Sequence, residues 1–424
     1  MNERFIYKDV DVILNKTSKF KSIVIDTTFE GEFNSSSIAQ KNLLHLVLEN
    51  NNKFVKTKEE VINKAFDLYN AVVDVNISVN HQILSTSFTL DIIDYDLINK
   101  GEVLFEALEY YRNFIFSPDV ENDSFQNDVF LEKKKAIKDS IVKRYNNKGA
   151  YAVRKLLEQM CPGELLEIPV TGTIEELEKI TPTSLYKTYL DMIENESLVI
   201  SITGNVTKEK AEKIIDTILG DYAYIKKECN LSPFDTTYHE VKEIKHLSEK
   251  QEINQSRLVM GFRTNINHQS PLARPLQLFN LMFGGMYSSN LFQKVREELS
   301  LAYSIYSDAY IGNQLFMVSA GVNSSDAQKV EEIVLEELAK YQNGDFNLEL
   351  LDEAKQFLIS DIERMDDSNY SINNYYYRQR LLGLDNSPSQ LRNKYLSVTK
   401  EDIIEASKMI ALDSVFTLVG DSNE

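Results

Sequence analysis

Few side chains in the sequence could bind a metal ion or carry out acid–base chemistry. It contains five histidines and two cysteines in 424 residues. His45 and Glu49 are four residues apart in a stretch whose apolar spacing predicts a helix, so both side chains would lie on one face and could share a metal ion. A catalytic zinc ion usually has three protein ligands, and no other histidine lies on a predicted helix nearby. The alternative is a partly buried histidine at the rim of the helix.

A second predicted helix, over about residues 125–145, carries two carboxylates on one face. Glu132 and Asp139 are seven residues apart, and such a pair could supply a metal ligand and a group that supports it. Lysines are interleaved with them, however, and this pattern favours a solvated, mixed-charge helix. They are Lys133, Lys134, Lys135, Lys138 and Lys143.

Arg296 and Tyr303 form a third candidate site. Arg296 lies near the end of a predicted helix, and Tyr303 lies at the start of the strand that follows. An arginine presents a rigid fork of donors to a carbonyl or carboxylate, and a tyrosine hydroxyl can donate to a polarised carbonyl. Alternatively, Arg296 pairs with a neighbouring glutamate and Tyr303 packs in the core. The preceding Gly284-Gly285 pair indicates either a chain reversal or a hinge.

The strands and helices that position these residues occur in the same order twice. In the first half, strands are predicted over 20–29, 72–90 and 197–203, and helices over 35–50, 57–69, 100–116 and 125–145 and from 151 and 181. In the second half, strands are predicted over 258–263, 302–310, 315–322 and 414–419, and helices over 271–282, 291–298, 325–342 and 346–365 and from 399.

Residue identities at nearly constant spacing indicate an internal duplication. Phe125, Glu132, Lys134 and Ile141 match Phe346, Glu353, Lys355 and Ile362 at an offset of 221, Thr181 matches Thr399 at 218, and Gly204 matches Gly420 at 216. We therefore predict an α+β protein of two homologous halves, with an N-terminal domain at 1–225, a linker at 226–245 and a C-terminal domain at 246–424.

Composition and charge exclude several classes of protein. The chain has 46 basic and 65 acidic residues and a net charge of −19, which disfavours binding to nucleic acid or to an anionic membrane surface. No run of about 18 apolar residues predicts a membrane span. Two cysteines cannot form a disulfide framework, so a reducing cytoplasm is the expected location.

The segment from Phe283 to Tyr303 resembles a signature of the insulinase (pitrilysin-like) family of zinc metallopeptidases. It reads FGGMYSSNLFQKVREELSLAY, and the family has there a Gly-Gly turn, a Ser-x-Leu-Phe helix, then V-R-E and L-A-Y. The resemblance extends over essentially the full chain. It implies two homologous α+β halves, each an antiparallel sheet flanked by helices, in agreement with the duplication.

Active members of this family carry an H-x-x-E-H motif on the early helix, with two zinc-binding histidines and a glutamate base. The resemblance places this motif on Asn42 to Leu46, so that Asn42 and Leu46 replace the histidines and His45 replaces the glutamate. The family's later glutamate ligand falls near Asp139-Ser140 without a clear match. The arginine and tyrosine that contact peptide in the family are retained as Arg296 and Tyr303. The resemblance thus implies no metal ligands and no catalytic residues on this chain.

This combination resembles the non-catalytic subunits of the family, which pair with an active, zinc-bearing paralogue, as in mitochondrial processing peptidase. Lys19-Phe-Lys21, Leu68-Tyr69 with Ala71, and Phe116-Ser-Pro118 are similar to Gram-positive bacterial proteins known as elongation factor P modification-associated, insulinase-like. We therefore expect a cytoplasmic heterodimer in which this chain is inactive alone and forms half of a peptide-binding chamber. Arg296 and Tyr303 would position the peptide, and the partner would hold the zinc.

Two other functions remain compatible with the sequence. The chain could be a peptide-binding or scaffold protein without a peptidase partner, like the family's core subunits of respiratory complexes. It could also be a self-sufficient metallopeptidase that uses an atypical site at His45 and Glu49.

Overall fold

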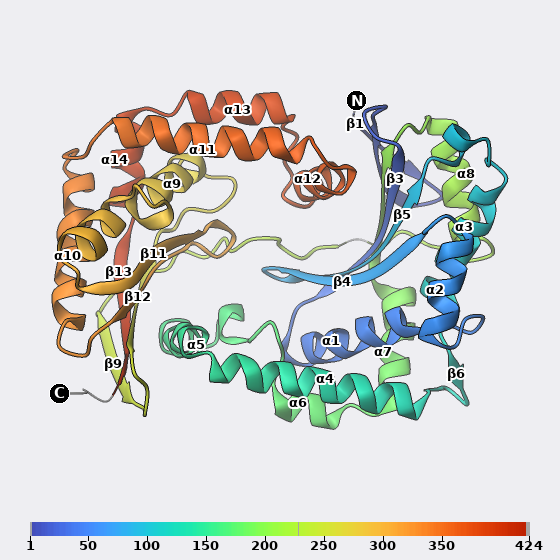
Figure 1. Ribbon diagram of the computed structural model, residues 1–424, viewed down its shortest axis with the longest axis horizontal. Coiled ribbons are helices and arrows are strands. Elements are labelled where there is room, and N and C mark those ends of the chain that lie inside the picture. Colours follow the sequence, from blue (N-terminus) through green and yellow to red (C-terminus); the bar gives the residue numbers. More distant parts are fainter. Residues whose placement is uncertain (1, 228, 421–424) are drawn as a thin grey trace. The chain divides into compact units, whose positions relative to one another are not determined.

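The computed structural model describes residues 2–227 and 229–420, which form two compact units (Figure 1). The first unit comprises the chain up to Ile141 together with Pro169–Pro233 and Arg364–Asp385. The second comprises Val142–Ile168, Phe234–Glu363 and the chain from Asn386 onward. No helix in the described ranges is both long enough and apolar enough to cross a membrane.

Six strands form the sheet of the first unit, in the order β1–β2–β8–β3–β5–β4. β2 and β8 run parallel, and the other neighbouring strands run antiparallel. The strands are β1 (Asn2–Tyr7), β2 (Val10–Lys16), β3 (Ser22–Glu32), β4 (Val72–Asn80), β5 (Ile83–Ile93) and β8 (Ser197–Gly204); β6 (Val120–Glu121) and β7 (Ser124–Phe125) form a separate short hairpin.

Five strands form the sheet of the second unit, in the order β11–β12–β10–β13–β9. β9 and β13 run parallel, and the other pairs are antiparallel. The strands are β9 (Lys245–Lys250), β10 (Ser256–Arg263), β11 (Ala302–Tyr310), β12 (Leu315–Val322) and β13 (Ala411–Val419).

The two sheets share one topology, which confirms the predicted duplication. Without the additional β1, the order β2–β8–β3–β5–β4 corresponds strand by strand to β9–β13–β10–β12–β11, including the position of the parallel pair. Gly204 ends β8, and Gly420 directly follows β13. The expected antiparallel sheets are therefore mixed, because a long crossover joins the two parallel strands of each sheet.

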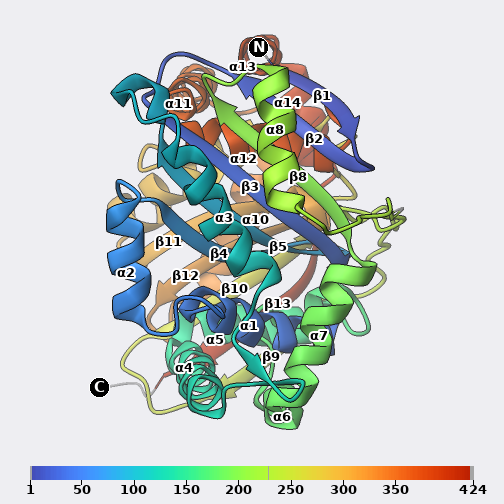
Figure 2. The same ribbon diagram turned by 90° about the vertical axis from the view of Figure 1, so that its right-hand side faces the viewer.

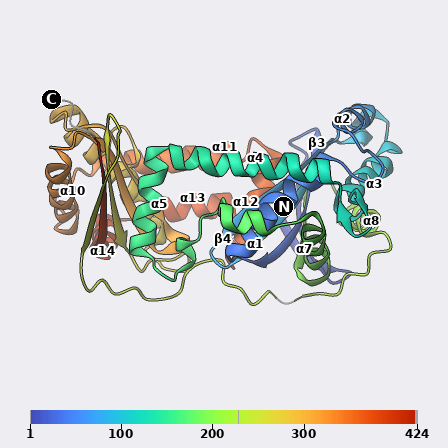
Figure 3. The same cartoon turned by 90° about the horizontal axis from the view of Figure 1, so that it is seen from below.

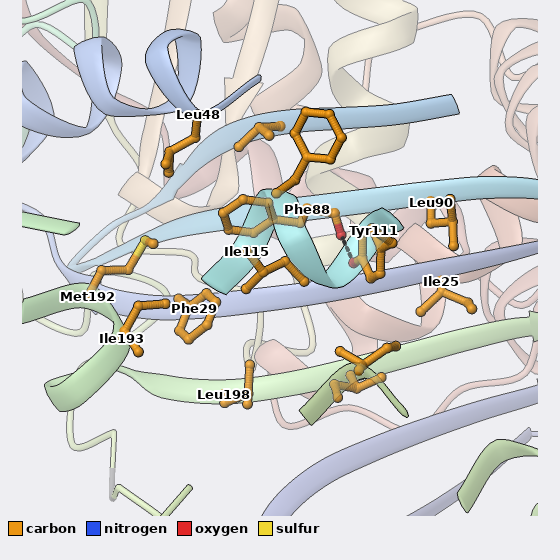
Figure 4. Close-up of a cluster of buried hydrophobic side chains, with 14 of the residues drawn as sticks. Ile25, Phe29, Leu48, Phe88, Leu90, Tyr111, Ile115, Met192, Ile193 and Leu198 are labelled. Atoms are coloured by element: carbon orange, nitrogen blue, oxygen red, sulfur yellow. Dashed lines mark hydrogen bonds between the residues drawn. The ribbon is translucent and has the colours of Figure 1, made fainter. Parts of the chain in front are cut away.

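The helices of the first unit, apart from α12, cover the apolar face of its sheet and enclose the core. On this face of β3, Ile25 and Phe29 are fully buried, and the Phe29 and Phe88 rings meet edge to face (Figure 4). The Tyr111 hydroxyl donates to the Phe88 carbonyl at 2.6 Å. The helices are α1 (Ser35–Asn50), α2 (Lys58–Asp67), η1 (Tyr95–Ile98), α3 (Val103–Phe116), α4 (Asn127–Asn146), α6 (Ile174–Lys179), α7 (Pro182–Asn195), α8 (Lys208–Leu219) and α12 (Asn369–Leu381). Residues Val142 to Asn146 of α4 belong to the second unit.

The second unit has its own buried core between its sheet and helices. Phe279, Phe283 and Phe316 stack or tilt against one another there, together with Tyr341. Its helices are α5 (Lys148–Met160), η2 (Leu165–Glu167), α9 (Ala273–Asn280), η3 (Leu281–Gly285), η4 (Phe292–Glu298), η5 (Ile311–Asn313), α10 (Ala327–Gln342), α11 (Glu349–Met365), α13 (Pro388–Leu396) and α14 (Lys400–Lys408). The last two residues of α11 belong to the first unit.

Each half of the sequence contributes one helix to the sheet formed by the other half. α5 packs on β10 and β13 of the second unit (Figure 3). α12 packs on β2, β3 and β8 of the first unit, on the face opposite α3 and α8 (Figure 2). The two helices are equivalent in the duplication, since both have 13 residues and 369 − 148 = 221. The compact units therefore differ from the expected domains 1–225 and 246–424 in these segments, because each helix buries its face on the other sheet.

Candidate functional site

The early helix that would carry a zinc motif is α1, and its local sequence explains where it begins. Asn34 caps it: the Asn34 side chain accepts from the Ser37 amide, and the Ser37 hydroxyl accepts from the Asn34 amide. Such a reciprocal cap satisfies two backbone donors at the start of a helix. Leu43, Leu44, Val47 and Leu48 are buried in the core of the first unit. Positions 42, 45 and 46 lie beside this buried stripe and are partly exposed.

The side chains at these three positions are engaged in local contacts or cannot bind metal. Asn42 Nδ2 donates to the Val170 carbonyl at 3.0 Å. His45 Nδ1 lies 3.2 Å from the carbonyl oxygen of Lys41, one turn earlier in its own helix. Burial lowers the pKa of His45, so the imidazole is neutral at pH 7. Leu46 offers no ligand atom. The arrangement agrees with the sequence interpretation of His45 as a partly buried histidine at the rim of the helix.

Glu49, the other member of the possible His45/Glu49 pair, is exposed at the end of α1. Partial burial and the nearby Asp74 raise its pKa, and Lys133 and Lys58 counteract this. Neither His45 nor Glu49 belongs to a set of three metal-ligand side chains within the described ranges. The described part of the chain therefore offers the atypical metallopeptidase site no third protein ligand.

Among the described residues, one set of three such side chains lies in the second unit, and it was not predicted from the sequence. Glu164, Asp235 and His239 place ligand atoms within 4.8 Å of one another. His239 Nε2 lies 2.7 Å from Asp235 Oδ2, and His239 Nδ1 lies 3.7 Å from Glu164 Oε1. They come from segments 75 residues apart, 239 − 164 = 75, so no local motif could have revealed them.

Charge balance identifies this cluster as a structural network. The buried Arg263 donates to both oxygens of Glu164, at 2.9 and 2.6 Å, and its Nε lies 3.3 Å from Asp413 Oδ2. A bidentate arginine already satisfies the Glu164 carboxylate, and its positive charge opposes a metal ion there. Asp235 Oδ1 accepts from the Thr237 amide. The network fastens the start of the chain that follows Pro233 to the second unit.

The paired carboxylates of α4 are solvated. Glu132 is exposed and lies 2.9 Å from the ammonium of Lys133, which lowers the Glu132 pKa. Asp139 and Ser140, where the family's later ligand was expected, are also exposed. This arrangement matches the interpretation of a mixed-charge helix surface.

The signature segment of the second unit begins with a close approach between two elements. α9 continues into the π-helical turn η3, which ends at Gly285. A Cβ atom on Gly284 would lie 2.7 Å from Ser307 Oγ and 2.8 Å from Ser307 N in β11. Ser307 Oγ in turn donates to Asn280 Oδ1 at 2.8 Å. The glycine pair ends the helix, and Gly284 lets it contact β11.

Arg296 and Tyr303 lie on adjoining elements and are both exposed. The Arg296 guanidinium stacks on the Phe292 ring at 4.7 Å, its Nε lies 3.6 Å from Glu297 Oε1, and 42% of its side chain is exposed. Tyr303 is 65% exposed on β11, the edge strand of its sheet. The alternative that Tyr303 packs in the core is therefore wrong. The bulge between Ala302 and Ser304 explains the difference, since it interrupts the inward–outward alternation of the strand.

Comparisons with known proteins agree with this picture. The family described as Peptidase M16 inactive domain matches residues 179–358. The chain is 27% identical over 409 residues to the "Probable inactive metalloprotease YmfF" of Bacillus subtilis (strain 168), covering 96% of this chain and 94% of that protein.

Two solved structures show the same fold. A conserved protein from Enterococcus faecalis V583 superposes with a TM-score of 0.92 at 21% identity, covering 100% of this chain and 99% of that one. A peptidase M16 inactive domain from Pseudomonas fluorescens superposes with a TM-score of 0.79 at 16% identity, covering 99% and 98%.

The duplicated α+β fold is that of the M16-like solved structure, and the sequence matches support an insulinase-like member of the M16 peptidase family. The matching family model and the matching YmfF protein are both described as inactive. The residues Asn42, His45 and Leu46, which stand where the resemblance places the H-x-x-E-H motif, are compatible with this description.

Proposed function

We propose that this chain is the non-catalytic subunit of a heterodimeric zinc peptidase. The observation that carries the proposal is the state of α1. The Asn42 side chain donates to the Val170 carbonyl, and the His45 imidazole lies beside the Lys41 carbonyl of the same helix. Leu46, at the third motif position, has an aliphatic side chain. A paralogue with an intact H-x-x-E-H motif would supply the zinc ion and the base, which activate water for attack on the peptide.

In this proposal, the second unit of the chain helps to hold the peptide. Arg296 and Tyr303 are exposed, and neither lies in a metal-ligand cluster of the described residues. The Arg296 guanidinium, held in place by the Phe292 ring, would bind a carbonyl or carboxylate of the substrate. The Tyr303 hydroxyl would donate to the carbonyl under attack. The chain would thereby form half of a peptide-binding chamber.

Reconstitution tests the proposal. The purified chain, its H-x-x-E-H paralogue, and an equimolar mixture of the two are assayed on a library of fluorogenic peptides, with complex formation followed by size-exclusion chromatography. We expect no cleavage by this chain alone, a stable complex, and hydrolysis by the mixture that zinc chelation abolishes. Full activity of the paralogue alone would contradict the proposal and favour a scaffold role. Activity of this chain alone would restore the self-sufficient metallopeptidase.

A further inference from the structure

Polar side chains fasten α12 to the first sheet. Asn369, Asn373, Tyr377 and Arg380 follow one another at helical spacing, so they lie on one face of α12. At the N-terminal end of this stripe, Asn369 Nδ2 donates to the Ser22 carbonyl at 2.6 Å.

One turn later, Asn373 joins two strands. Asn373 Nδ2 donates to Asp26 Oδ2 at 2.7 Å, and the Thr203 hydroxyl donates to Asn373 Oδ1 at 2.7 Å. Asn373 is fully buried. Its amide therefore depends on Asp26 of β3 and Thr203 of β8 for its hydrogen bonds.

The C-terminal half of the stripe surrounds a second buried carboxylate. Tyr377 donates to Glu30 Oε1 at 3.0 Å, and its hydroxyl lies 2.9 Å from the Ser85 hydroxyl. Arg380 Nη1 donates to both Glu30 oxygens, at 2.6 and 2.7 Å, and Arg380 Nη2 donates to Asp11 Oδ2 at 2.8 Å. Glu30 thus has a cation beside it, whereas among the described residues Asp26 has none.

The equivalent helix of the other unit docks mainly by apolar contacts. α5 buries Ala152 and Leu156 against Val259 of β10 and Phe416 of β13, and such contacts do not change with pH. The Tyr151 hydroxyl also donates to Glu249 of β9 at 2.9 Å, but the pKa of Tyr151 is raised and that of Glu249 is lowered, so neither titrates between pH 5.5 and 7.5. The duplication therefore contains two docked helices of equal length, of which α12 adds a polar stripe with buried carboxylates to its apolar contacts.

Asp26 is the uncompensated group in the polar interface. Its Oδ1 is enclosed and has no hydrogen-bond partner, and no ion pair reaches the carboxylate within the described ranges. Burial raises the pKa of Asp26 to about 6, and the nearby Thr89 hydroxyl and the Asn373 amide counteract this only in part. The titratable groups that sense it electrostatically are Tyr370 of α12 and Tyr111 of α3, which are neutral below pH 9 because burial raises both of their pKa values.

We propose that α12 is a proton-sensitive clasp on the first sheet: it holds most firmly when Asp26 is protonated and loosens when Asp26 is ionised. An ionised carboxylate with one unsatisfied, enclosed oxygen opposes docking, because opening of α12 would let water reach it. A protonated Asp26 removes this penalty. The clasp is a property of the chain by itself and does not depend on a peptidase partner.

The direction of the pH effect follows from linkage. The pKa of docked Asp26 is about 6, and the ordinary value of an exposed aspartate is about 3.9. Docking is therefore strengthened as pH falls through about 6 and weakened as pH rises through it, by about fourfold between pH 5.5 and 7.5. Below about pH 4 the trend reverses, because Asp11, whose pKa is lowered by Arg380 and Lys226 in spite of partial burial, becomes protonated.

Hydrogen exchange measured by mass spectrometry on the full chain tests the clasp. Amide protection of residues 369–381, corrected for the intrinsic pH dependence of exchange, is compared at pH 5.5 and 7.5 with that of residues 148–160 in α5. We expect α12 protection to fall about fourfold at pH 7.5 and α5 protection to stay constant. The proposal would be overturned if amide protection in α12 were the same at both pH values, or if protection in α5 fell by the same factor. This test needs no variant.

Variants identify the titrating group. Asp26→Asn, which mimics the neutral acid, should hold α12 at the higher protection at both pH values. The control is Asp139→Asn, an exposed carboxylate of α4 in the first unit; it should keep the wild-type trend. An Asp26→Asn chain that retains the wild-type trend assigns the effect to another group and overturns the proposal.

Discussion

At the scale of single residues, α1 is a packing element. Its buried leucines enclose the core of the first unit. The positions beside them have side chains that contact carbonyl oxygens or are aliphatic. Packing of the helix depends on its apolar stripe and not on Asn42, His45 or Leu46, so the fold of the proposed non-catalytic subunit does not need metal ligands at these positions.

The state of α1 predicts the metal content of the purified chain. We expect well under one zinc ion per chain, because His45 and Glu49 have no third ligand within the described ranges and two-ligand sites hold zinc weakly. Elemental analysis after gel filtration measures this directly. About one tightly held zinc per chain that disappears in His45→Ala would show that the atypical site exists.

Arg296 and Tyr303 can be separated by kinetics in the reconstituted complex. Tyr303→Phe removes a hydroxyl that would donate to the developing oxyanion, and should lower kcat by on the order of 10²-fold. Arg296→Ala removes a charged donor to the bound peptide and should raise KM by about tenfold. Tyr306→Phe, on the same strand and 47% exposed, is the control. If all three variants match the wild type in an intact complex, these residues do not position the substrate.

At the scale of elements, a buried ion pair joins α1 to the end of α7. Lys41 Nζ lies 2.7 Å from Glu196 Oε1, and the exposed fractions of the two side chains are 4% and 11%. Burial lowers the pKa of Lys41 and raises that of Glu196. Each charge therefore depends on the other to remain ionised.

Removal of one member of the Lys41–Glu196 pair should lower the free energy of unfolding more than removal of both. Lys41→Met leaves Glu196 buried without a cation and should lower the free energy of unfolding by about 3–5 kcal/mol, whereas Lys41→Met with Glu196→Leu should recover most of the loss. Urea denaturation at pH 7 measures both. The single-variant loss should shrink at lower pH, where Glu196 takes up a proton. Lys294→Met, which breaks an exposed pair with Glu298, should change stability by less than about 1 kcal/mol.

The contact between η3 and β11 makes Gly284 intolerant of a side chain. Gly284→Ala places a Cβ against Ser307 N at 2.8 Å, and backbone cannot give way cheaply. We expect a loss of about 1–3 kcal/mol in the free energy of unfolding. Gly149→Ala in α5, where the nearest atom is 3.4 Å away, is the helical control and should be neutral or slightly stabilising. Equal stability of the two variants in thermal unfolding would show that the close approach is not required.

The elements that the sequence revealed are those with an apolar periodic face or a capping box. Thr57 and Thr399 begin helices as expected, each with a reciprocal cap. The strands and helices not predicted from the sequence are β1, β2, β6, β7, β9, α6, α8, α12 and α13. α12 has little apolar periodicity because it docks on a polar sheet face, through Asn369, Asn373 and Arg380. Periodicity reports apolar burial, so a helix buried by polar contacts escapes it.

At the scale of the whole molecule, the duplication could be predicted because the two halves have identical residues at a nearly constant offset in the sequence. The offset of 221 found in the sequence also relates α5 to α12. That each of these helices packs on the sheet of the other half could not be predicted, because the spacing of residues along the chain does not determine which sheet a helix contacts. The Glu164–Arg263 network was hidden for the same reason, because its members meet only in the folded second unit.

The exchange predicts how the two halves behave when separated. A fragment of residues 1–225 retains the first sheet but lacks α12, so Ile13, Val199 and Asp26 lose their cover. A fragment of residues 226–424 retains the second sheet but lacks α5, and Val259 and Phe416 become exposed. Uncovering several large apolar side chains costs about 1.5–3 kcal/mol each, comparable in sum to the whole stability of a domain.

We therefore expect each fragment alone to be aggregation-prone or digested rapidly by protease, and the two fragments produced together to form a protease-resistant 1:1 complex. Size-exclusion chromatography and limited proteolysis measure this. A version of the co-produced pair with Leu156→Asp in α5 should fail to assemble, whereas Lys155→Asp, on the half-exposed neighbouring position, should assemble normally. Independent folding of both fragments would show that the exchanged helices contribute little, and that the halves, rather than the compact units, are the units of stability.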